Sequence, residues 1–331
     1  MLNFRLTGRG GESLYDKDYD VVIVGGGPAG LVAGLYAARA GLNAVLVEKG
    51  VAGGQMATTE RVENCPGCIE GSGAEIGDWM RRQATNFGLK WANAEVEGLQ
   101  LLAEPKTVIT AEGMLRAPVV ILATGARPRK LGVPGEEKFW GHGVSVCATC
   151  DAPFTEGKVV AAVGGGDSAV KESDYLTRFA KKVYLLHRRG RLRAERLNQE
   201  RLLANPKVEV RYNVVVERIL GEDTVRGVVT RNVLTGQQEE LAADAVFVWI
   251  GMIPNTELFT GQVAVDDWGY VITDASMATS APGVFAVGDV RSGATRQIVT
   301  AAADGAVAAL NAYEYLHERT NKDLVSPGVE G

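Results

Sequence analysis

Two Cys-x-x-Cys pairs are the residues of this chain best suited to chemistry, and one of them favours thiol–disulfide exchange. Cys147 and Cys150 are followed directly by Asp151. At this spacing one thiol can have a lowered pKa, and the second cysteine can resolve a mixed disulfide. The adjacent carboxyl can donate or take the proton that disulfide reduction requires. We therefore expect Cys147, Cys150 and Asp151 to be catalytic.

The other pair, Cys65-Pro-Gly-Cys68, leaves several interpretations open. It could be a second redox pair, a minor metal site or a coincidence in a turn rich in glycine and proline. One zinc site shared by all four cysteines is disfavoured, because Cys147 lies 79 residues after Cys68 (147 − 68 = 79) and the usual spacing is roughly 15–20. Paired cysteines in a reducing cytoplasm indicate redox or metal chemistry first, and inert buried cysteines are the remaining alternative.

An internal repeat predicts the elements that position these residues. Residues 20–48 contain VVIVGGGPAG, LVAGLYAARAG and NAVLVEK, and residues 158–189 contain VVAAVGGGDSA, VKESDYLTRFA and KKVYLLHRR. In each stretch an apolar run bounded by glycines predicts a buried parallel strand, followed by a helix and another strand. The sequence therefore predicts an α/β fold with two Rossmann-like dinucleotide-binding domains.

The first repeat carries the Gly-x-Gly-x-x-Gly spacing at Gly25, Gly27 and Gly30. These glycines permit a tight turn, close approach of backbone to a pyrophosphate, and close helix–strand packing. The phosphate then sits at the N-terminus of the helix. Glu48 stands at the end of the next strand, where a carboxylate can accept hydrogen bonds from a ribose. The combination suits FAD; a structural turn and a lone surface glutamate are the alternatives.

The second repeat has Gly164, Gly166 and Ala169 at the same spacing, but a basic cluster replaces the acid. The cluster consists of His187, Arg188, Arg189 and Arg193. A 2′-phosphate would be repelled by a carboxylate and is well matched by planar guanidinium donors. The second repeat is therefore expected to bind NADPH. The alternative is a solvated basic turn, since RRGRLRAER continues basic for several residues.

The remaining segments predict how the two domains are connected. Residues 119–128, 246–256 and 283–290 are typical of short strands, and Gln297 to Arg319 is typical of a long Ala-rich helix. Because the first repeat and the C-terminal segment flank the second repeat, we expect one domain to be inserted in the other. The expected divisions are an extension over 1–18, a discontinuous FAD domain over 19–129 and 255–331, and an NADPH domain over 130–254.

Composition excludes several other classes of protein. The chain has 331 residues, 46% hydrophobic and 23% charged, which is typical of a globular protein with two domains. A net charge of −5 without a long basic run argues against nucleic acid and anionic membranes as partners. There is no apolar stretch of the roughly 18 residues that a membrane helix needs, and no secretory signal in the first twenty, so a cytoplasmic location is expected.

The order and spacing of the motifs resemble a known family. GGGPAG, GGQMATTERVEN, ATGARP, CATCD, GGGDSA, HRRGRLR and GDVRSGATRQIVTAAADG are similar to those of the low-molecular-weight, bacterial-type thioredoxin reductases, from Asp20 to about His317. The resemblance implies a homodimeric flavoprotein that passes electrons from NADPH through FAD to the Cys147/Cys150 dithiol. From there they go to thioredoxin or a thioredoxin-like protein.

The resemblance also implies residue roles. Cys150 would face the flavin, and Cys147 would attack the thioredoxin disulfide, with Asp151 as proton donor. The FAD site would comprise Gly25, Gly27, Pro28, Ala29, Gly30, Glu48, Lys49, Gly53, Gly54, Gln55, Asn64, Ala123, Thr124, Gly125, Gly288, Asp289, Arg296, Gln297 and Ile298. The NADPH site would comprise Gly164, Gly166, Asp167, Ser168, Ala169, His187, Arg188, Arg189 and Arg193.

Some residues depart from the family pattern. The stretch after Asp151 has Pro153 before Phe154, where two aromatics are common, and Cys65 stands at a position that commonly has a bulky aromatic. His142 could assist as a base or be a surface histidine. Flavin-dependent dithiol oxidases are a rival class that the basic cluster disfavours. Ferredoxin–NADP reductases of this scaffold are disfavoured by the dithiol, and a nucleotide-binding module without activity would leave the proton donor unexplained.

A last expectation concerns movement. The dithiol and the nicotinamide are expected to share one domain, yet both must reach the same flavin. We therefore expect that domain to rotate about two short linkers between half-reactions.

Overall fold

The computed structural model describes residues 13–59, 62, 64–68 and 71–325. The chain divides into two compact units. Unit 1 combines the described parts of Met1–Ala57, Ala74–Gly125 and Pro254–Gly331, and unit 2 combines those of Thr58–Gly73 and Ala126–Ile253. Thr58 lies close to Gly141 of unit 2, where a Cβ would be only 2.7 Å from the Thr58 carbonyl oxygen.

Unit 1 is built on a parallel sheet of five strands in the order β19-β8-β2-β3-β4. The central strand β2 reads VVIV and is buried at all four positions, as expected for a β-branched strand covered on both faces. The strands are β2 (Val21–Val24), β3 (Ala44–Glu48), β4 (Lys90–Asn93), β8 (Val119–Leu122) and β19 (Val284–Ala286).

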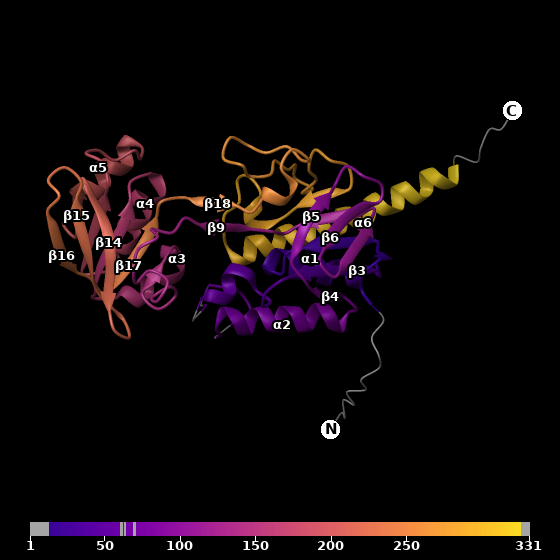
Figure 1. Cartoon of the computed structure of the whole chain (residues 1–331), viewed down its shortest axis with the longest axis horizontal. Helices are drawn as coiled ribbons and strands as arrows, with labels where there is room; N and C mark the ends of the chain where they lie inside the picture. Colours follow the sequence, from indigo (N-terminus) through magenta and orange to yellow (C-terminus); the bar gives the residue numbers. More distant parts are fainter. Residues whose placement is uncertain (1–12, 60–61, 63, 69–70, 326–331) are drawn as a thin grey trace, which may run out of the picture. The chain divides into compact units, whose positions relative to one another are not determined.

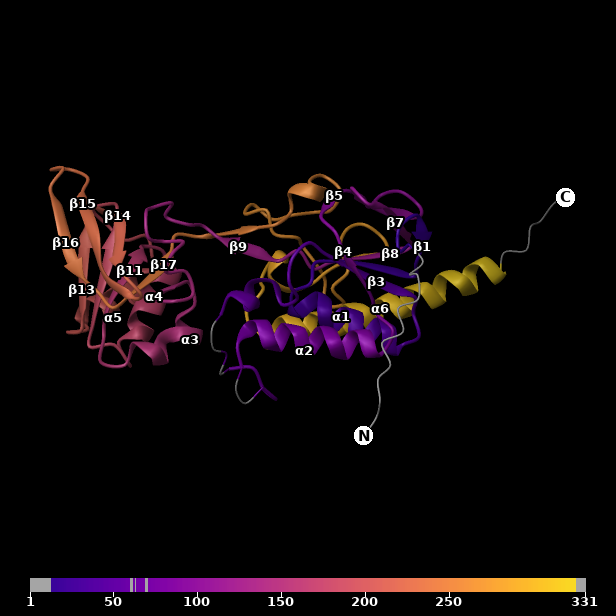
Figure 2. The same ribbon diagram turned by 60° about the horizontal axis from the view of Figure 1, so that its bottom comes forward.

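Two different layers cover the two faces of this sheet. On one face, helices α1 and α6 bury Val21 and Ile23; on the other, a small mixed sheet in the order β1-β7-β6-β5 buries Val22 and Val24. Figure 2 shows the three layers, with the small sheet above and the helices below. These elements are α1 (Pro28–Arg39), α2 (Gly73–Asn86), α6 (Ile298–Val325), β1 (Lys17–Asp18), β5 (Val96–Gln100), β6 (Lys106–Thr110) and β7 (Gly113–Ala117).

Unit 2 repeats this plan on a parallel sheet in the order β10-β17-β11-β12-β13. Helices α3, α4 and α5 cover one face, and an antiparallel sheet of β14, β15 and β16 covers the other. Figure 1 shows these three antiparallel strands side by side. The elements are β10 (Val144–Ser145), α3 (Ala148–Asp151), β11 (Val159–Gly164), α4 (Asp167–Leu176), β12 (Lys182–His187), α5 (Arg196–Ala204), β13 (Val208–Tyr212), β14 (Val214–Gly221), β15 (Val225–Asn232), β16 (Gln238–Ala242) and β17 (Ala245–Trp249).

Where the chain passes between the units, β9 (Ala126–Pro128) pairs with β18 (Met252–Pro254). The predicted α/β fold with two dinucleotide-binding domains is confirmed, and each repeat forms the expected strand–turn–helix–strand unit. The predicted C-terminal helix is also confirmed, but α6 runs beyond Arg319 to Val325. In both parallel sheets the glycine turns follow the carboxyl ends of the strands, which is where such sheets bind ligands.

Candidate active site

Cys147 and Cys150 form a disulfide in unit 2, with their Cα atoms 5.3 Å apart. Cys147 caps the short helix α3, and its backbone N–H donates to Ser145 Oγ at 3.1 Å. One residue earlier, the Val146 carbonyl accepts a hydrogen bond of 3.0 Å from Trp249 Nε1 on β17. These contacts fix the chain where β10 leads into the disulfide, and both cysteines remain half-buried.

Asp151 is positioned to hold and move a proton beside this disulfide. Its Oδ2 accepts a hydrogen bond from the Ser145 hydroxyl. Burial raises the pKa of the Asp151 carboxyl above its ordinary value, although the Ser145 hydrogen bond opposes the shift. A carboxyl with a raised pKa keeps its proton closer to neutral pH, as a general acid must.

A second carboxyl near the disulfide had no signature in the sequence. Glu172 on α4 accepts a hydrogen bond of 3.2 Å from the backbone N–H of Ala148, the residue after Cys147. Burial raises the pKa of Glu172 as well. Its distance of 24 residues along the chain from Ala148 explains why no local motif reveals it.

In unit 1 the glycine turn after β2 has the geometry that the spacing predicts. Gly25 has φ +109°, and a Cβ there would lie 2.4 Å from the Ala123 carbonyl oxygen. A Cβ on Gly30 would lie 2.0 Å from the Gly25 carbonyl oxygen. At Gly27, by contrast, no atom lies within 4 Å of a Cβ position, so this side of the turn is open. A pyrophosphate fits such an open turn at the start of a helix.

The N-terminus of α1 provides backbone donors for that pyrophosphate. Gly27 is the N-cap residue and Pro28 is the first helical residue, and no side chain caps the helix. The first N–H groups of a helix lack partners within the helix, and they carry the positive end of its dipole. Both properties favour a phosphate at this position.

Glu48 joins the glycine turn to the loop after β3. Its Oε2 accepts a hydrogen bond of 2.7 Å from the Gly26 N–H, and its Oε1 accepts one of 2.8 Å from the Gly50 N–H. A carboxylate has about four acceptor positions, so each oxygen can still accept a ribose hydroxyl. Lys49, the next residue, instead pairs with Glu95 at 2.8 Å on the surface.

Three further segments predicted to bind FAD converge on the same turn. The Gly53 N–H donates to the Gly26 carbonyl at 2.8 Å, and a Cβ on Gly54 would lie 3.1 Å from Gly27 Cα. A Cβ on Gly288 would lie 3.0 Å from Ala29 Cβ. The segment Ala123, Thr124 and Gly125 adjoins Gly25, as the Gly25–Ala123 approach shows.

The turn of Asp289 depends on an ion pair that the sequence motifs do not reveal. Asp304 on α6 accepts a hydrogen bond of 3.1 Å from the Gly288 N–H. The same carboxylate receives two hydrogen bonds from the Arg291 guanidinium, at 2.6 and 2.9 Å. Burial raises the pKa of Asp289; Arg296 opposes this shift and Asp304 adds to it.

Arg296, just before α6, has the left-handed value φ +59°. Its guanidinium donates to the Tyr270 hydroxyl at 3.1 Å and lies over the Tyr270 ring, 5.5 Å from the centroid. Tyr270 therefore supports an unusual backbone conformation beside Gln297 and Ile298. No sequence pattern connected Tyr270 with these residues.

In unit 2 the glycine turn after β11 repeats the unit 1 geometry with one change. A Cβ on Gly164 would lie 2.6 Å from the Trp249 carbonyl oxygen, and Gly166 is as open as Gly27. Gly166 caps α4, again without a side-chain cap. Ala169 stands where unit 1 has Gly30, and its side chain is fully buried. This turn also fits a pyrophosphate.

The structure places His187 differently from the arginines with which it was grouped. The residue is 5% exposed, and its ring has Nδ1 2.8 Å from the Gly164 carbonyl oxygen and Nε2 2.9 Å from the Arg191 carbonyl oxygen. Because both ring nitrogens face the backbone, His187 links the glycine turn to the basic loop. Arg188, Arg189 and Arg193 are exposed, and Arg193 N–H donates to the Gly165 carbonyl at 2.7 Å.

Asp167 and Ser168 begin α4 beside this turn. Asp167 accepts hydrogen bonds from the Glu195 N–H at 2.9 Å and from Asn198 Nδ2 at 3.3 Å. These bonds lower the pKa of Asp167, the one from Glu195 most. Asp167 therefore holds the far end of the basic loop, while Ser168 is exposed.

Unit 2 also contains four further residues that were singled out from the sequence: Asn64, Cys65, Cys68 and His142. Asn64 belongs to the Thr58–Gly73 segment of unit 2, so its expected flavin contact stays a prediction. His142 is exposed, and Cys65 and Cys68 are free thiols. In the part of the chain that the structure describes, no group of three or more His, Cys, Asp or Glu side chains could hold a metal ion.

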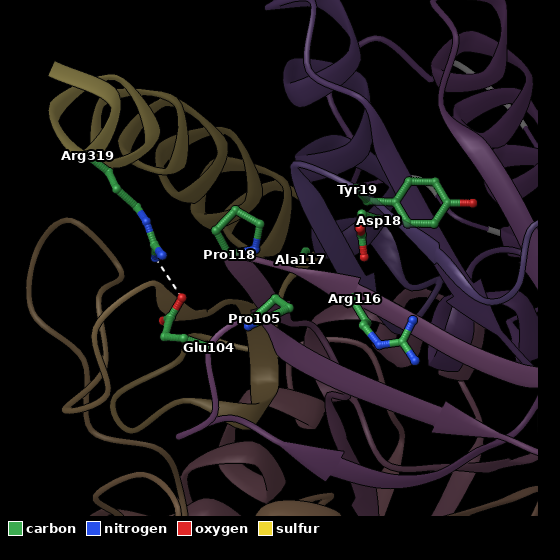
Figure 3. A pocket seen from close by; sticks show the side chains of 8 residues that line it. All are labelled: Asp18, Tyr19, Glu104, Pro105, Arg116, Ala117, Pro118 and Arg319. Atoms are coloured by element: carbon green, nitrogen blue, oxygen red, sulfur yellow. Dashed lines mark hydrogen bonds and ion pairs between the residues drawn. The ribbon is translucent and has the colours of Figure 1, made fainter. Parts of the chain in front are cut away.

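One cavity lies at the opposite edge of the unit 1 sheet. It has a volume of about 360 Å³ and is lined by Asp18, Tyr19, Glu104, Pro105, Arg116, Ala117, Pro118 and Arg319. Figure 3 shows Glu104 reaching toward Arg319 on α6, and this ion pair measures 2.6 Å. Tyr19 and Pro118 precede β2 and β8, so the cavity adjoins the amino ends of the strands and is separate from the nucleotide turns.

Comparisons with known proteins agree with this geometry. Residues 19–305 match the family described as pyridine nucleotide-disulphide oxidoreductase. Thioredoxin reductases of Listeria monocytogenes and Treponema pallidum are 43% and 45% identical, each over 92% of this chain and over 95% and 100% of their own lengths. The crystal structure of thioredoxin reductase from Streptococcus pyogenes is 44% identical, covers 91% of this chain and 99% of its own, and has a TM-score of 0.87.

A helix able to span a membrane does not occur among the described residues. The two nucleotide turns, the disulfide between them in the sequence and the similarity along nearly the whole chain lead to one assignment. The chain belongs to the thioredoxin reductase family of the pyridine nucleotide-disulphide oxidoreductases.

Proposed function

We propose that this protein is an NADPH-dependent thioredoxin-disulfide reductase. When bound, FAD would accept an electron pair from NADPH and supply it to the Cys147–Cys150 disulfide. The observation that carries the proposal is this disulfide, which lies beside a carboxyl with a raised pKa and in the same unit as the basic loop. The relatives' shared name supplies the acceptor, a thioredoxin disulfide.

In the proposed mechanism the two cysteines have separate tasks. Once reduced, Cys147 attacks the disulfide of thioredoxin and forms a mixed disulfide with it. Cys150 then attacks Cys147, which restores the Cys147–Cys150 disulfide and releases the dithiol of thioredoxin. Asp151 holds the proton that the leaving thiolate needs, and Ser145 orients the Asp151 carboxyl by a hydrogen bond.

The nucleotide sites follow from the two turns. Gly27 and the N-terminus of α1 would receive the FAD pyrophosphate, while Glu48 accepts the ribose hydroxyls. Gly166 and the N-terminus of α4 would receive that of NADPH. The 2′-phosphate would pair with Arg188, Arg189 and Arg193, and His187 would hold their loop in place.

Unit 2 carries both the dithiol and the proposed nicotinamide site, and both would have to reach the same flavin, one in each half-reaction. We therefore infer rotation of unit 2 about the β9 and β18 connections between half-reactions. A cross-link that locks the units in one orientation should leave one half-reaction intact and abolish turnover. Full turnover of a locked enzyme would contradict the rotation.

We further propose a cytoplasmic homodimer that uses thioredoxin or a thioredoxin-like protein as its partner. The cytoplasm is the compartment in which thiols are kept reduced, which supports the proposed location. The family resemblance supports the dimer. Sedimentation of the FAD-loaded protein should give twice the mass of one chain. A monomer that remains active would contradict the dimer without affecting the proposed reaction.

An anaerobic rapid-mixing experiment tests the reaction. NADPH should bleach the flavin absorbance of the purified protein, and added thioredoxin disulfide should restore it with formation of two thiols per thioredoxin. Cys150→Ser should abolish thioredoxin reduction and still allow bleaching. Bleaching by a reduced ferredoxin or a small dithiol, but not by NADPH, would overturn the proposal.

A further inference from the structure

Cys65 and Cys68 close a tight turn in unit 2, outside the machinery described above. The Cys68 N–H donates to the Cys65 carbonyl at 3.0 Å, which makes the two cysteines the first and last residues of a β-turn. Gly67 has φ +88°, the left-handed value that the third position of a type II turn requires, and Pro66 precedes it. The turn is therefore a backbone structure encoded by Pro66 and Gly67.

This turn holds the two sulfurs where a disulfide can form. The Cα atoms at the ends of a β-turn lie less than about 7 Å apart, and a disulfide spans about 4.4–6.8 Å. The Cys68 side chain lies close enough to Cys65 to contribute to the raised pKa of the Cys65 thiol. The same Cys-x-x-Cys spacing at Cys147 and Cys150 is already closed in this protein. Closing the turn would therefore require rotation of two side chains and little change in the backbone.

The two thiols are not joined in a disulfide, and each is partly exposed. Both cysteines are free and half-buried, and Pro66 and Gly67 between them are exposed. Burial most of all, with a contribution from the neighbouring Cys68, raises the pKa of Cys65 to about 11. The raised pKa leaves little thiolate on Cys65 at neutral pH, which suits a resolving step in which Cys65 attacks the Cys68 sulfur.

We propose that Cys65 and Cys68 are a second redox-active dithiol, which reduces low-molecular-weight disulfides and closes to a Cys65–Cys68 disulfide. Cys68 thiolate attacks one sulfur of the small disulfide, forms a mixed disulfide and releases one small thiol. Cys65 loses its proton and attacks the Cys68 sulfur, which breaks the mixed disulfide and releases the second small thiol. Two electrons and two protons pass from the protein to the two thiols.

The test uses the full-length, FAD-loaded protein with the other pair removed by Cys147→Ser and Cys150→Ser. The reduced protein is mixed anaerobically with 2-hydroxyethyl disulfide, and released thiol and protein mass are followed. The proposal predicts two small thiols released per chain, a loss of two hydrogens from the protein and a cross-link between Cys65 and Cys68 in peptide maps. Absence of thiol release, or a product in which Cys65 and Cys68 are separately modified, would overturn it.

Single substitutions separate the two steps. In the same background, Cys65→Ser should release one thiol and retain the other as a stable adduct on Cys68. Cys68→Ser should slow the first release at least tenfold at neutral pH. If Cys65→Ser and Cys68→Ser released small thiol at the same rate and in the same amount as the Cys147→Ser/Cys150→Ser protein, the assignment of the two steps to Cys68 and Cys65 would be wrong. Retention of FAD and of the circular dichroism spectrum shows that each variant is folded, and Cys65→Ala provides a second substitution at the same position.

This outcome is independent of the proposed function. Cys65→Ser/Cys68→Ser in the otherwise unchanged chain should keep NADPH-dependent thioredoxin turnover. If the unchanged protein failed to reduce thioredoxin, the proposed function would fail and the thiol release by Cys65 and Cys68 would still decide the second site. Tight binding of Zn²⁺ to the reduced pair with no thiol release would instead identify a metal site and overturn the redox assignment.

Discussion

The two glycine turns share a backbone geometry but differ in the side chain at the end of the following strand, which is a carboxylate in unit 1 and an imidazole in unit 2. In unit 1 the strand ends in Glu48, whose carboxylate accepts from the Gly26 and Gly50 N–H groups. In unit 2 the strand ends in His187, whose ring nitrogens face the Gly164 and Arg191 carbonyls. Each side chain joins its glycine turn to the loop beyond the strand.

The middle glycine of each turn makes this connection possible. A Cβ on Gly26 would lie 2.8 Å from Glu48 Cγ, and a Cβ on Gly165 would lie 2.1 Å from His187 Nδ1. Neither glycine needs a left-handed backbone. Their shared task is to leave room for the side chain at the strand end. The same turn can thus be joined to the following loop by a carboxylate or by an imidazole, and in unit 2 the exposed arginines after His187 supply the basic site.

The largest effect should come from the third position of the glycine motif, which is Gly30 in unit 1 and the larger Ala169 in unit 2. Gly30→Ala places a Cβ 2.0 Å from the Gly25 carbonyl oxygen, so the turn must distort. We expect loss of FAD and of about 3 kcal/mol of stability, the upper end of the usual cost of overpacking a core. The matched change Ala169→Gly in unit 2 should cost about 1 kcal/mol. Flavin absorbance after gel filtration and thermal unfolding measure both; equal losses would contradict the comparison.

The next effect concerns Glu48. Glu48→Ala leaves two backbone N–H groups without their acceptor and removes the proposed ribose contact. Hydrogen bonds to charged groups contribute about 1.5–3 kcal/mol, so FAD should bind about 10- to 100-fold more weakly. Glu95→Ala is the control: Glu95 is the exposed ion-pair partner of Lys49, and its removal should change the affinity for FAD little. An unchanged FAD affinity in Glu48→Ala would remove Glu48 from the site.

His187 should show a smaller effect that is confined to the coenzyme. His187→Ala frees one end of the basic loop, so KM for NADPH should rise about three- to tenfold with kcat nearly unchanged, a cost of roughly 1 kcal/mol. Gly165→Ala should act in the same direction because it displaces the ring. His142→Ala, at an exposed histidine, is the control. A fall in kcat with unchanged KM would contradict a positioning role.

The smallest effect is on the pH dependence of stability, and it concerns two buried carboxyls, Asp151 in unit 2 and Asp289 in unit 1. Burial raises the pKa of both. A raised folded-state pKa means that the stability contribution is complete below the unfolded pKa and is lost as pH rises through the folded pKa. Asp151→Asn should therefore gain stability relative to the unchanged protein as pH rises from about 4, and little below it. Denaturant unfolding across pH checks this; a difference that grows toward acid pH would reverse the sign.

The same Asp151→Asn variant should lose thioredoxin turnover, because an amide holds no transferable proton. In the unchanged protein, turnover should decline as pH rises through the pKa of Asp151. A variant with the unchanged protein's turnover and pH profile would remove Asp151 from the mechanism.

Local patterns predicted much of this architecture. Gly25, Gly27 and Gly30 follow a buried strand and open a helix, as the local pattern predicted, although the close approach of Ala123 to Gly25 comes from a distant part of the sequence. Helix α6 was predicted too short because its Ala-rich pattern fades near Arg319 while the helix continues to Val325.

Contacts between residues far apart in the sequence could not be predicted, because no local motif indicates them. Asp304 holds the Gly288 turn from 16 residues away, and Tyr270 supports Arg296 from 26 residues away. His187 was grouped with the arginines because of its position after Gly164. The structure shows that the His187 ring faces the backbone. The ring occupies the space that Gly165 leaves open, and the sequence does not indicate that contact.

Coenzyme selectivity tests the contrast between the two turns most directly. The measurement is the ratio of kcat/KM for NADPH to that for NADH, with thioredoxin as acceptor, in the unchanged protein and in Arg188→Ala/Arg189→Ala. If these guanidinium groups bind the 2′-phosphate, kcat/KM should fall about 100-fold for NADPH and change little for NADH. An equal loss with both coenzymes would show that the basic loop does not recognise the 2′-phosphate.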